Sequence, residues 1–369
     1  MLRYGCKPCV RSVNVIFQRY KTKSYSNFRR TERSHPATIR NIIYPVRINE
    51  IGDNLHAKYW IEVRKRAPST LEMEKKHWLE SEPPLTKQEI NDAQALFNKA
   101  KVKLEWTLAD YDEIPDVKYR RLRREREESI ENMDPFKRTE YHNNLLKSRK
   151  LLGTPPEALI KLPEILLLGH ANAGKSTLIN NLLMKKGSDK LDKIARVSER
   201  AGFTQTLNCY NIGGKLRIID SPGYGMYGKL NQGKLVMDYI TRRDRLAGAF
   251  VLIDIRKGIR PEDRVLLECL QDNEINHDVI FTKFDQFIQE VYPLRQNRPT
   301  RLLDIDKAMT YSDRMNSIAR DWVDEVIKDM PYSQRCFFNN ALTSEFVPQV
   351  SGYKHVRAAI LQKCKEFEN

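Results

Sequence analysis

Two glycines, a lysine and a serine stand at fixed spacing in one short segment of the chain. The segment comprises Gly169, His170, Ala171, Asn172, Ala173, Gly174, Lys175, Ser176 and Thr177. This spacing is typical of a loop that wraps phosphate groups, because glycine lets the backbone curl until its N–H groups point at phosphate oxygens. We expect the Lys175 ammonium to reach the β- and γ-phosphates of a nucleotide and the Ser176 hydroxyl to bind Mg²⁺.

A second group of residues has the chemistry to complete a magnesium site. Asp220 is followed by Ser, Pro and Gly223, an arrangement in which the carboxylate holds Mg²⁺ through water and the Gly223 N–H meets the γ-phosphate. Thr204, two residues after Gly202, lies between the phosphate loop and Asp220 in the sequence. Its hydroxyl would join the magnesium shell in the triphosphate state. The sequence therefore predicts a Mg²⁺ ion held by Ser176, Thr204 and Asp220.

A third motif, Thr282-Lys283-Phe-Asp285, indicates the base of the nucleotide. An Asp carboxylate accepts two hydrogen bonds from the N1–H and the exocyclic amine of guanine, whereas adenine offers no such pair of adjacent donors. The aliphatic stem of Lys283 can lie over the ring. A later segment is expected to complete the pocket with a backbone N–H, and it consists of Asn340, Ala341 and Leu342. Together the motifs predict that GTP is the nucleotide.

These motifs fall at the ends of predicted strands. The predicted strands are 164–168, 206–212, 216–219, 249–253, 278–281 and 336–339, and the predicted helices are 177–185, 234–246, 261–272, 305–328 and 354–367. Alternation of strands with helices predicts an α/β fold with a mostly parallel six-stranded sheet and helices on both faces. In such sheets ligands bind at the carboxyl ends of the strands. We therefore expect a P-loop GTPase fold over residues 161–369, with a helical N-terminal extension.

Residues 32–160 are predicted to form that extension, largely helical and charged. Thr86 and Glu89 have the spacing of a capping box, and apolar residues at helical spacing follow, so a helix is expected from about residue 87 to 108. Charged residues and helix formers dominate from 116 to about 150, with an interruption at Pro135. Solvated helices with mixed-sign pairs are one interpretation, and a helix that contacts RNA is the other.

Residues 1–31 contain no Asp or Glu but eight Lys or Arg, and the whole chain carries a net charge of +16. Apolar residues between 10 and 20 share one helical face. An Arg-rich, acid-poor, amphipathic start predicts a mitochondrial transit peptide and a place in the matrix. The alternative is a basic arm that binds nucleic acid. No apolar stretch approaches the roughly 20 residues of a membrane span, so a transmembrane segment is not expected.

The motifs together resemble the EngB (YihA-type) family of ribosome-assembly GTPases. The resemblance covers about residues 162–369 and is carried by Gly169–Thr177, by 194–198 leading to 202–205, by 220–225, and by 254–259 with Asp263. It implies a GTP-hydrolysing switch in large-subunit assembly. With the predicted transit peptide, the implied partner is the mitochondrial large ribosomal subunit or its rRNA, and DNA is not expected.

The resemblance also bears on catalysis, for which Lys175, Asn172 and Thr204 are the expected residues. Tyr224 occupies the position where many GTPases have a glutamine that orients the attacking water. Tyrosine cannot present an amide to that water, so slow intrinsic hydrolysis is expected. By resemblance to related families, Asn172 would help to hold a K⁺ ion against the phosphates. The alternative is that Asn172 only bonds its own loop backbone.

Three functions fit the motifs. The first is an assembly GTPase whose segments 188–206 and 221–234 become ordered on the γ-phosphate. The second is a metabolic phosphotransferase, which is disfavoured because no Arg-rich lid motif is visible in the sequence. The third is a weakly or non-hydrolysing GTP-binding scaffold in mitochondria, which the missing glutamine favours.

Overall fold

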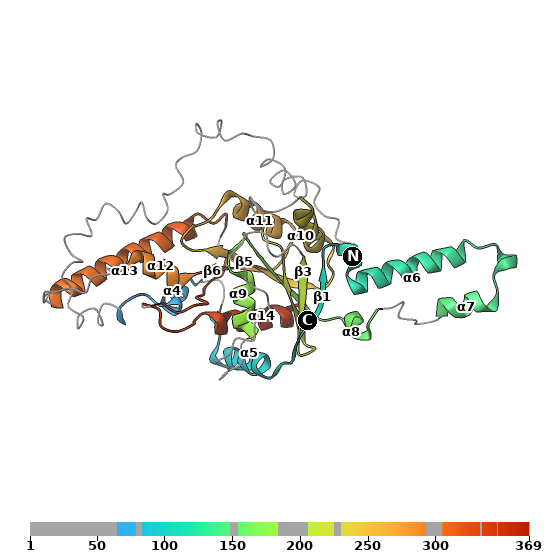
Figure 1. The fold of residues 1–369 in the computed structure, drawn as a ribbon, viewed down its shortest axis with the longest axis horizontal. Helices are drawn as coiled ribbons and strands as arrows, with labels where there is room; N and C mark the ends of the chain where they lie inside the picture. Colours follow the sequence, from blue (N-terminus) through green and yellow to red (C-terminus); the bar gives the residue numbers. More distant parts are fainter. Residues whose placement is uncertain are drawn as a thin grey trace, which may run out of the picture.

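A computed structural model describes residues 65–78, 83–147, 154–183, 206–224, 230–292, 305–332, 334–344 and 346–368. Its centre is a seven-stranded sheet in the order β1-β3-β4-β2-β5-β6-β7 (Figure 1). The strands are β1 (Val102–Leu108), β2 (Glu164–Gly169), β3 (Leu207–Ile212), β4 (Leu216–Asp220), β5 (Leu246–Asp254), β6 (His277–Thr282) and β7 (Cys336–Phe338). β4, β2, β5, β6 and β7 run parallel, and β3 is antiparallel to both β1 and β4. The predicted α/β fold is confirmed.

Helices cover both faces of the sheet, as predicted. One face is covered by α5 (Lys87–Lys99), α9 (Lys175–Leu183) and α14 (Tyr353–Glu368). The other is covered by α10 (Leu230–Arg242), α11 (Pro261–Asp272), α12 (Phe284–Val291) and α13 (Ile305–Lys328). Neighbouring residues of β2 enter opposite cores, with Leu166 on one side and Leu167 on the other. Burial on both sides explains why this strand is an unbroken apolar run.

The N-terminal extension supplies the seventh strand, so the prediction of six strands was too low. The capping box of Thr86 and Glu89 is present and starts α5. The helix, however, ends at Lys99 and not near residue 108, and Ala100 is already extended. The next segment forms β1, an edge strand paired antiparallel with β3. Pairing with a distant strand therefore replaced the helix that local spacing predicted.

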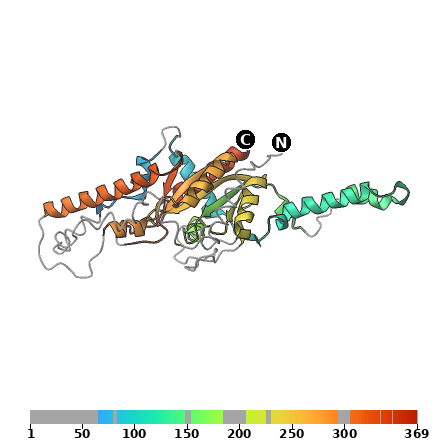
Figure 2. The same ribbon diagram turned by 90° about the horizontal axis from the view of Figure 1, so that it is seen from above.

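The charged part of the extension forms an arm that projects from the body of the molecule (Figures 1 and 2). Its elements are α6 (Pro115–Glu131), η4 (Pro135–Lys137) and α7 (Glu140–Lys147). Three shorter helices, α4 (Thr70–Lys76), η3 (Tyr111–Glu113) and α8 (Pro156–Leu159), lie elsewhere in the extension. The predicted charged helices and their interruption at Pro135 are thus present.

The arm is anchored to the sheet by buried ion pairs at the start of α6. Asp116 Oδ2 accepts a hydrogen bond from Arg243 Nη1 at 2.9 Å and lies 3.4 Å from Arg245 Nη2. Arg243 also donates to both carboxylate oxygens of Glu164, the first residue of β2, at 2.6 Å each. Removing one partner of such a buried network costs several kcal/mol, on the order of 3–5 kcal/mol. The network therefore fixes where the arm leaves the sheet.

Among the described residues, no helix is long and apolar enough to span a bilayer. Residues 1–64, which include the predicted transit peptide, lie outside the described part of the chain, as do Gly202 and Thr204.

Candidate functional site

The phosphate loop lies where the sequence predicts it, between β2 and α9, and it closes around its own lysine. Lys175 Nζ donates hydrogen bonds to the carbonyl oxygens of Gly169 at 2.7 Å and His170 at 3.0 Å. Only 6% of Lys175 is exposed. Burial lowers the pKa of Lys175 to about 8, although the charge of Asp220 opposes that shift. The ammonium is thus positioned inside the loop, where phosphate oxygens would replace the carbonyl oxygens as acceptors.

The backbone geometry of the loop accounts for its glycines. A Cβ atom on Gly169 would lie 2.7 Å from the carbonyl oxygen of Leu252 on β5, a distance that only glycine avoids. Gly174 has a φ of +94°, in the region that side chains disfavour. Asn172 has a φ of 65°, a left-handed conformation that asparagine tolerates better than most residues. The loop conformation therefore depends on these residue types.

Two of the three predicted magnesium ligands are in contact. Ser176 Oγ donates a hydrogen bond to Asp220 Oδ2 at 3.0 Å, so the hydroxyl and the carboxylate share one place at the ends of α9 and β4. The other carboxylate oxygen, Asp220 Oδ1, is buried and has no hydrogen-bond partner among the described residues. Burial raises the pKa of Asp220 to about 6, against the charge of Lys175 and the hydrogen bond from Ser176. A hydrated Mg²⁺ ion would supply the missing partner, so these residues fit the metal.

The residues predicted to bind guanine lie beside the phosphate loop. Thr282 Oγ1 donates to the carbonyl oxygen of Ala173 at 2.8 Å, which joins the end of β6 to the loop. Lys283 has a φ of 60° and immediately precedes α12. Its ammonium donates to Asp254 Oδ2 at 3.0 Å, which fixes the direction of the side chain. Asp285 in the first turn of α12 is 5% exposed, and burial raises its pKa while hydrogen bonding by its own backbone and that of Gln286 lowers it.

The segment that follows β7 is held next to α12. The Asn340 side chain is fully buried, and its amide donates to the carbonyl oxygens of Leu342 and Gln349, each at 2.8 Å. Ser344 Oγ donates to the carbonyl oxygen of Asp285 at 3.4 Å. The Leu342 side chain is 57% exposed. Asn340 therefore shapes this loop from inside, and the loop reaches the predicted base residue through Ser344, which sequence reasoning had not selected.

Comparisons with known proteins agree with this geometry. Residues 164–283 match the family described as "50S ribosome-binding GTPase". MIOREX complex component 8 of Saccharomyces cerevisiae is 31% identical over 301 residues, which covers 82% of each chain. A probable GTP-binding protein EngB of Streptococcus pyogenes is 36% identical over 156 residues, or 41% of this chain and 75% of the relative. The chain belongs to the EngB-type GTPases. It therefore binds GTP with Mg²⁺ and hydrolyses GTP.

In this EngB-type GTPase the segment after β4 lies directly against the phosphate loop. A Cβ atom on Gly223 would lie 2.7 Å from the Cα atom of Ala171. The Ala171 N–H donates to the Tyr224 carbonyl oxygen at 3.1 Å, and the Tyr224 N–H donates to the Gly169 carbonyl oxygen at 3.3 Å. Gly223 is thus placed beside the loop, as a residue that meets the γ-phosphate must be.

The side chain of Tyr224 is directed toward α11. Its hydroxyl donates to Asp263 Oδ1 at 2.6 Å, and its ring lies 4.9 Å from the His170 ring. Burial raises the pKa of Tyr224 well above its ordinary value, and the neighbouring Asp263 carboxylate raises it further. The phenol is therefore a neutral hydrogen-bond donor that is already bound to a carboxylate.

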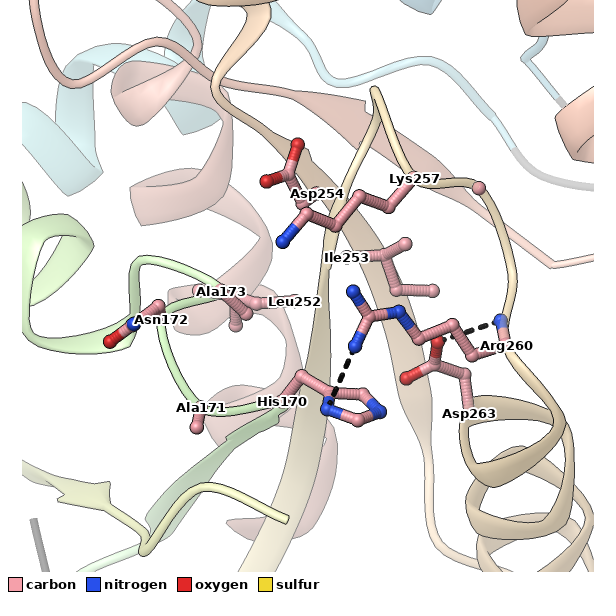
Figure 3. A pocket seen from close by; sticks show the side chains of 11 residues that line it. His170, Ala171, Asn172, Ala173, Leu252, Ile253, Asp254, Lys257, Arg260 and Asp263 are labelled. Atoms are coloured by element: carbon pink, nitrogen blue, oxygen red, sulfur yellow. Dashed lines mark hydrogen bonds between the residues drawn. The ribbon is translucent and has the colours of Figure 1, made fainter. Parts of the chain in front are cut away.

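A pocket lies on the outer side of the phosphate loop, against the loop that follows β5 (Figure 3). Arg260 crosses this pocket to His170, with 3.1 Å between Arg260 Nη1 and His170 Nδ1. Asp263 Oδ2 accepts a hydrogen bond from the Arg260 N–H at 2.9 Å. The pocket wall thus connects α11 to the loop and to Tyr224.

Asp254 and Arg256 are functional candidates that sequence reasoning used only as family markers. Arg256 donates to both oxygens of Asp254, at 2.9 Å and 2.8 Å. Burial raises the pKa of Asp254, but the hydrogen bond from Arg256 and the charge of Lys283 outweigh it and lower the pKa to about 2. Asp254 therefore stays ionised and holds Lys283 in the base motif. The Asp-x-Arg spacing was the available signal.

Proposed function

We propose that this protein is a GTP-hydrolysing switch that acts in the assembly of the mitochondrial large ribosomal subunit. The observation that carries the proposal is the placement of Lys175, Ser176 and Asp220 around one point at the end of β2, with a carboxylate oxygen left for a metal. The family description names 50S ribosome binding, and the yeast relative is named as a component of the MIOREX complex. Both names fit a GTPase that works on a ribosome.

The residues would divide the work as follows. Phosphate is bound by the loop from Gly169 to Thr177 and by Gly223, Mg²⁺ by Ser176, Asp220 and Thr204, and guanine by Thr282, Lys283, Asp285, Asn340, Ala341 and Leu342. Gly202 would approach the nucleotide together with Thr204. Asn172 would hold K⁺ against the phosphates, and its left-handed backbone places it at the turn of the loop. The K⁺ would supply the positive charge that an arginine supplies in other GTPases.

A second candidate is a scaffold that binds GTP and hydrolyses it weakly or not at all. The hydrogen bond between Tyr224 and Asp263 favours slow hydrolysis, because a phenol held by α11 does not orient a water molecule. Single-turnover hydrolysis by the purified protein, with K⁺ and with Na⁺, separates the two. A switch hydrolyses faster in K⁺, whereas a scaffold shows negligible turnover with either ion.

The principal test is sedimentation of the tagged protein with mitochondrial large subunits. We expect the protein to sediment with the subunit when a non-hydrolysable GTP analogue is bound and to dissociate with GDP. Lys175→Ala serves as the control, because it should fail to sediment under either condition. Equal sedimentation with both nucleotides would contradict a switch, and its absence with both would contradict a ribosomal partner.

We further propose that residues 1–31 are a mitochondrial transit peptide, that 32–160 form the N-terminal extension and that 161–369 form the G domain, which acts in the matrix. The membrane potential draws a positively charged presequence inward, and residues 1–31 carry no acid. A reporter fused to residues 1–40 should enter mitochondria. If it stays in the cytosol and the native protein begins at Met1, the basic-arm alternative applies. Deletion of residues 1–31 should then flatten the salt dependence of RNA binding.

A further inference from the structure

The arm formed by α6, η4 and α7 ends in an exposed aromatic side chain. Phe136 on η4 is 99% exposed, and Tyr141 at the start of α7 is 66% exposed. Figure 2 shows this tip far from the sheet. An aromatic side chain at the end of a projecting arm buries no surface within the described fold. Its free energy of burial is therefore available to a partner.

The tip is held in a defined shape. The Phe136 N–H donates to Asp134 Oδ1 at 3.0 Å, and the Lys137 N–H donates to the Asp134 carbonyl oxygen at 2.8 Å. On the other side of the turn, the Thr139 N–H donates to His142 Nδ1 at 3.2 Å. These bonds present the Phe136 ring on an ordered turn and engage the Asp134 carboxylate within that turn.

The charges at the tip differ from those at the root of the arm. Lys137 and Arg138 are exposed, and neither forms an ion pair within the part of the chain that the structure describes. Nearer the root, basic side chains have carboxylate partners: Lys118 lies 2.5 Å from Glu113, and Arg123 lies 2.7 Å from Glu127. Unpaired cations beside an exposed ring favour an anionic partner with flat, stackable groups.

We propose that the tip of the arm binds single-stranded RNA, with an unpaired base stacked on Phe136 and the adjoining phosphates on Lys137 and Arg138. Proteins recognise RNA mostly at unpaired bases that stack on aromatic side chains, while basic side chains contact the backbone. The source of the RNA, a ribosomal subunit, rests on the proposed function, but the chemistry of the tip does not. The buried ion pairs of Asp116 hold the arm at a fixed angle to the G domain, so the RNA contact and the GTP site keep a set separation.

The first experiment measures binding of the full chain to a synthetic RNA hairpin with an unpaired loop, by fluorescence anisotropy. Phe136→Ala should weaken binding by about 5-fold to 150-fold, the range that loss of one stacked base gives. Phe136→Trp should restore it, because tryptophan also stacks. Phe367→Ala is the matched control, since Phe367 on α14 is another exposed phenylalanine, 43% exposed, on the body of the protein.

The second experiment measures the salt dependence of the same binding. Replacing Lys137 and Arg138 by glutamine should lower the slope of log affinity against log salt by about 1.4, or about 0.7 for each phosphate contact on a single strand. The control replaces Lys101 and Lys103 by glutamine, because both are exposed on the body near β1. A slope that falls equally in both double variants would mean diffuse attraction and would overturn the site.

Three outcomes would overturn the inference: hairpin affinity unchanged in Phe136→Ala, equal affinity for the hairpin and for a fully paired duplex, or loss of sedimentation with the large subunit at unchanged hairpin affinity. The last would indicate a protein partner. The inference and the proposed function fail separately. Phe136-dependent hairpin binding without nucleotide-dependent sedimentation refutes only the proposed function, and sedimentation that Phe136→Ala leaves intact refutes only the RNA contact.

Discussion

The hydroxyl of Tyr224 donates a hydrogen bond to Asp263 Oδ1 at 2.6 Å and so ties the segment after β4 to the first turn of α11. The backbone of Tyr224 is at the same time hydrogen-bonded to the phosphate loop at Gly169 and Ala171. One residue therefore links the loop to a helix on the opposite side of the pocket shown in Figure 3. Movement of this segment on nucleotide binding would be transmitted to α11 through a single side chain.

We expect Tyr224→Phe to lower the free energy of unfolding by about 1–3 kcal/mol, because a buried carboxylate loses a donor. The rate of GTP hydrolysis should stay within about twofold, since the phenol is bound to Asp263 and does not reach a water at the γ-phosphate. Chemical denaturation and single-turnover hydrolysis measure the two effects. A tenfold fall in the hydrolysis rate at full nucleotide occupancy would show that the hydroxyl takes part in the reaction.

Lys175→Ala should abolish GTP binding and leave the fold intact. Lys175 donates to two carbonyl oxygens of the loop and belongs to neither apolar core. Its pKa of about 8 lies below the ordinary value of 10.5, which means that the fold disfavours the buried ammonium. The variant should therefore unfold at the same or a higher denaturant concentration at pH 7. Titration with GTP and a denaturation curve check both points, with Lys99→Ala, exposed at the end of α5, as the control.

Local patterns in the sequence were sufficient for the nucleotide motifs, because each of them depends on its neighbours. The phosphate loop needs a strand before it, a helix after it and glycines between, and all of these lie within residues 164–183. The contact of Asp254 with Lys283 was not foreseen, since it joins residues 29 apart. It exists because Asp254 and Thr282 lie side by side at the ends of β5 and β6, a register that only the folded sheet defines.

The error at β1 has the same origin. Leu104 continues the helical spacing of α5, so periodicity alone extended the helix. In the structure Leu104 pairs with Tyr210, more than a hundred residues along the chain. The pairing also lets Glu105 accept a hydrogen bond from buried Arg217 at 2.6 Å. Such long-range pairs leave no local signal, and tertiary contacts routinely override propensity.

The stability of the fold should fall as the pH drops below about 6.5, and His277 is one cause. Burial lowers the pKa of His277, although a hydrogen bond to the Ile275 carbonyl oxygen opposes the shift. Its Nε2 atom is buried without a hydrogen-bond partner among the described residues. Because the folded pKa lies below the unfolded value, the unfolded chain binds the extra proton. This contribution is fully present above pH 6.5 and is lost as the pH falls through that value.

His277→Gln should accordingly flatten the dependence of the free energy of unfolding on pH between about 6.5 and 5, by at most about 1.4 kcal/mol for each pH unit. Denaturation at a series of pH values provides the measurement. His142→Gln on the exposed arm is the control and should leave the slope as in the wild type. Part of the slope should remain in His277→Gln, because burial also lowers the pKa of His77. An unchanged slope in His277→Gln would contradict the assignment.

Asp285→Asn should shift nucleotide preference from GTP toward xanthosine triphosphate. The carboxylate of Asp285 would accept hydrogen bonds from the N1–H and the amine of guanine, and xanthine has a carbonyl where guanine has the amine. The amide of asparagine can donate to that carbonyl, so the variant replaces a lost acceptor with a matching donor. A site built for a hydrogen bond rejects the wrong partner by about 10⁴-fold or more. Competition binding of the two nucleotides to wild type and variant measures the shift. Asp92→Asn, exposed on α5, is the matched control and should keep the preference for GTP. Intact GTP preference in Asp285→Asn would place the base elsewhere. Loss of both nucleotides with a normal denaturation curve would mean that the buried carboxylate positions α12 and the Ser344 loop, and does not contact the base.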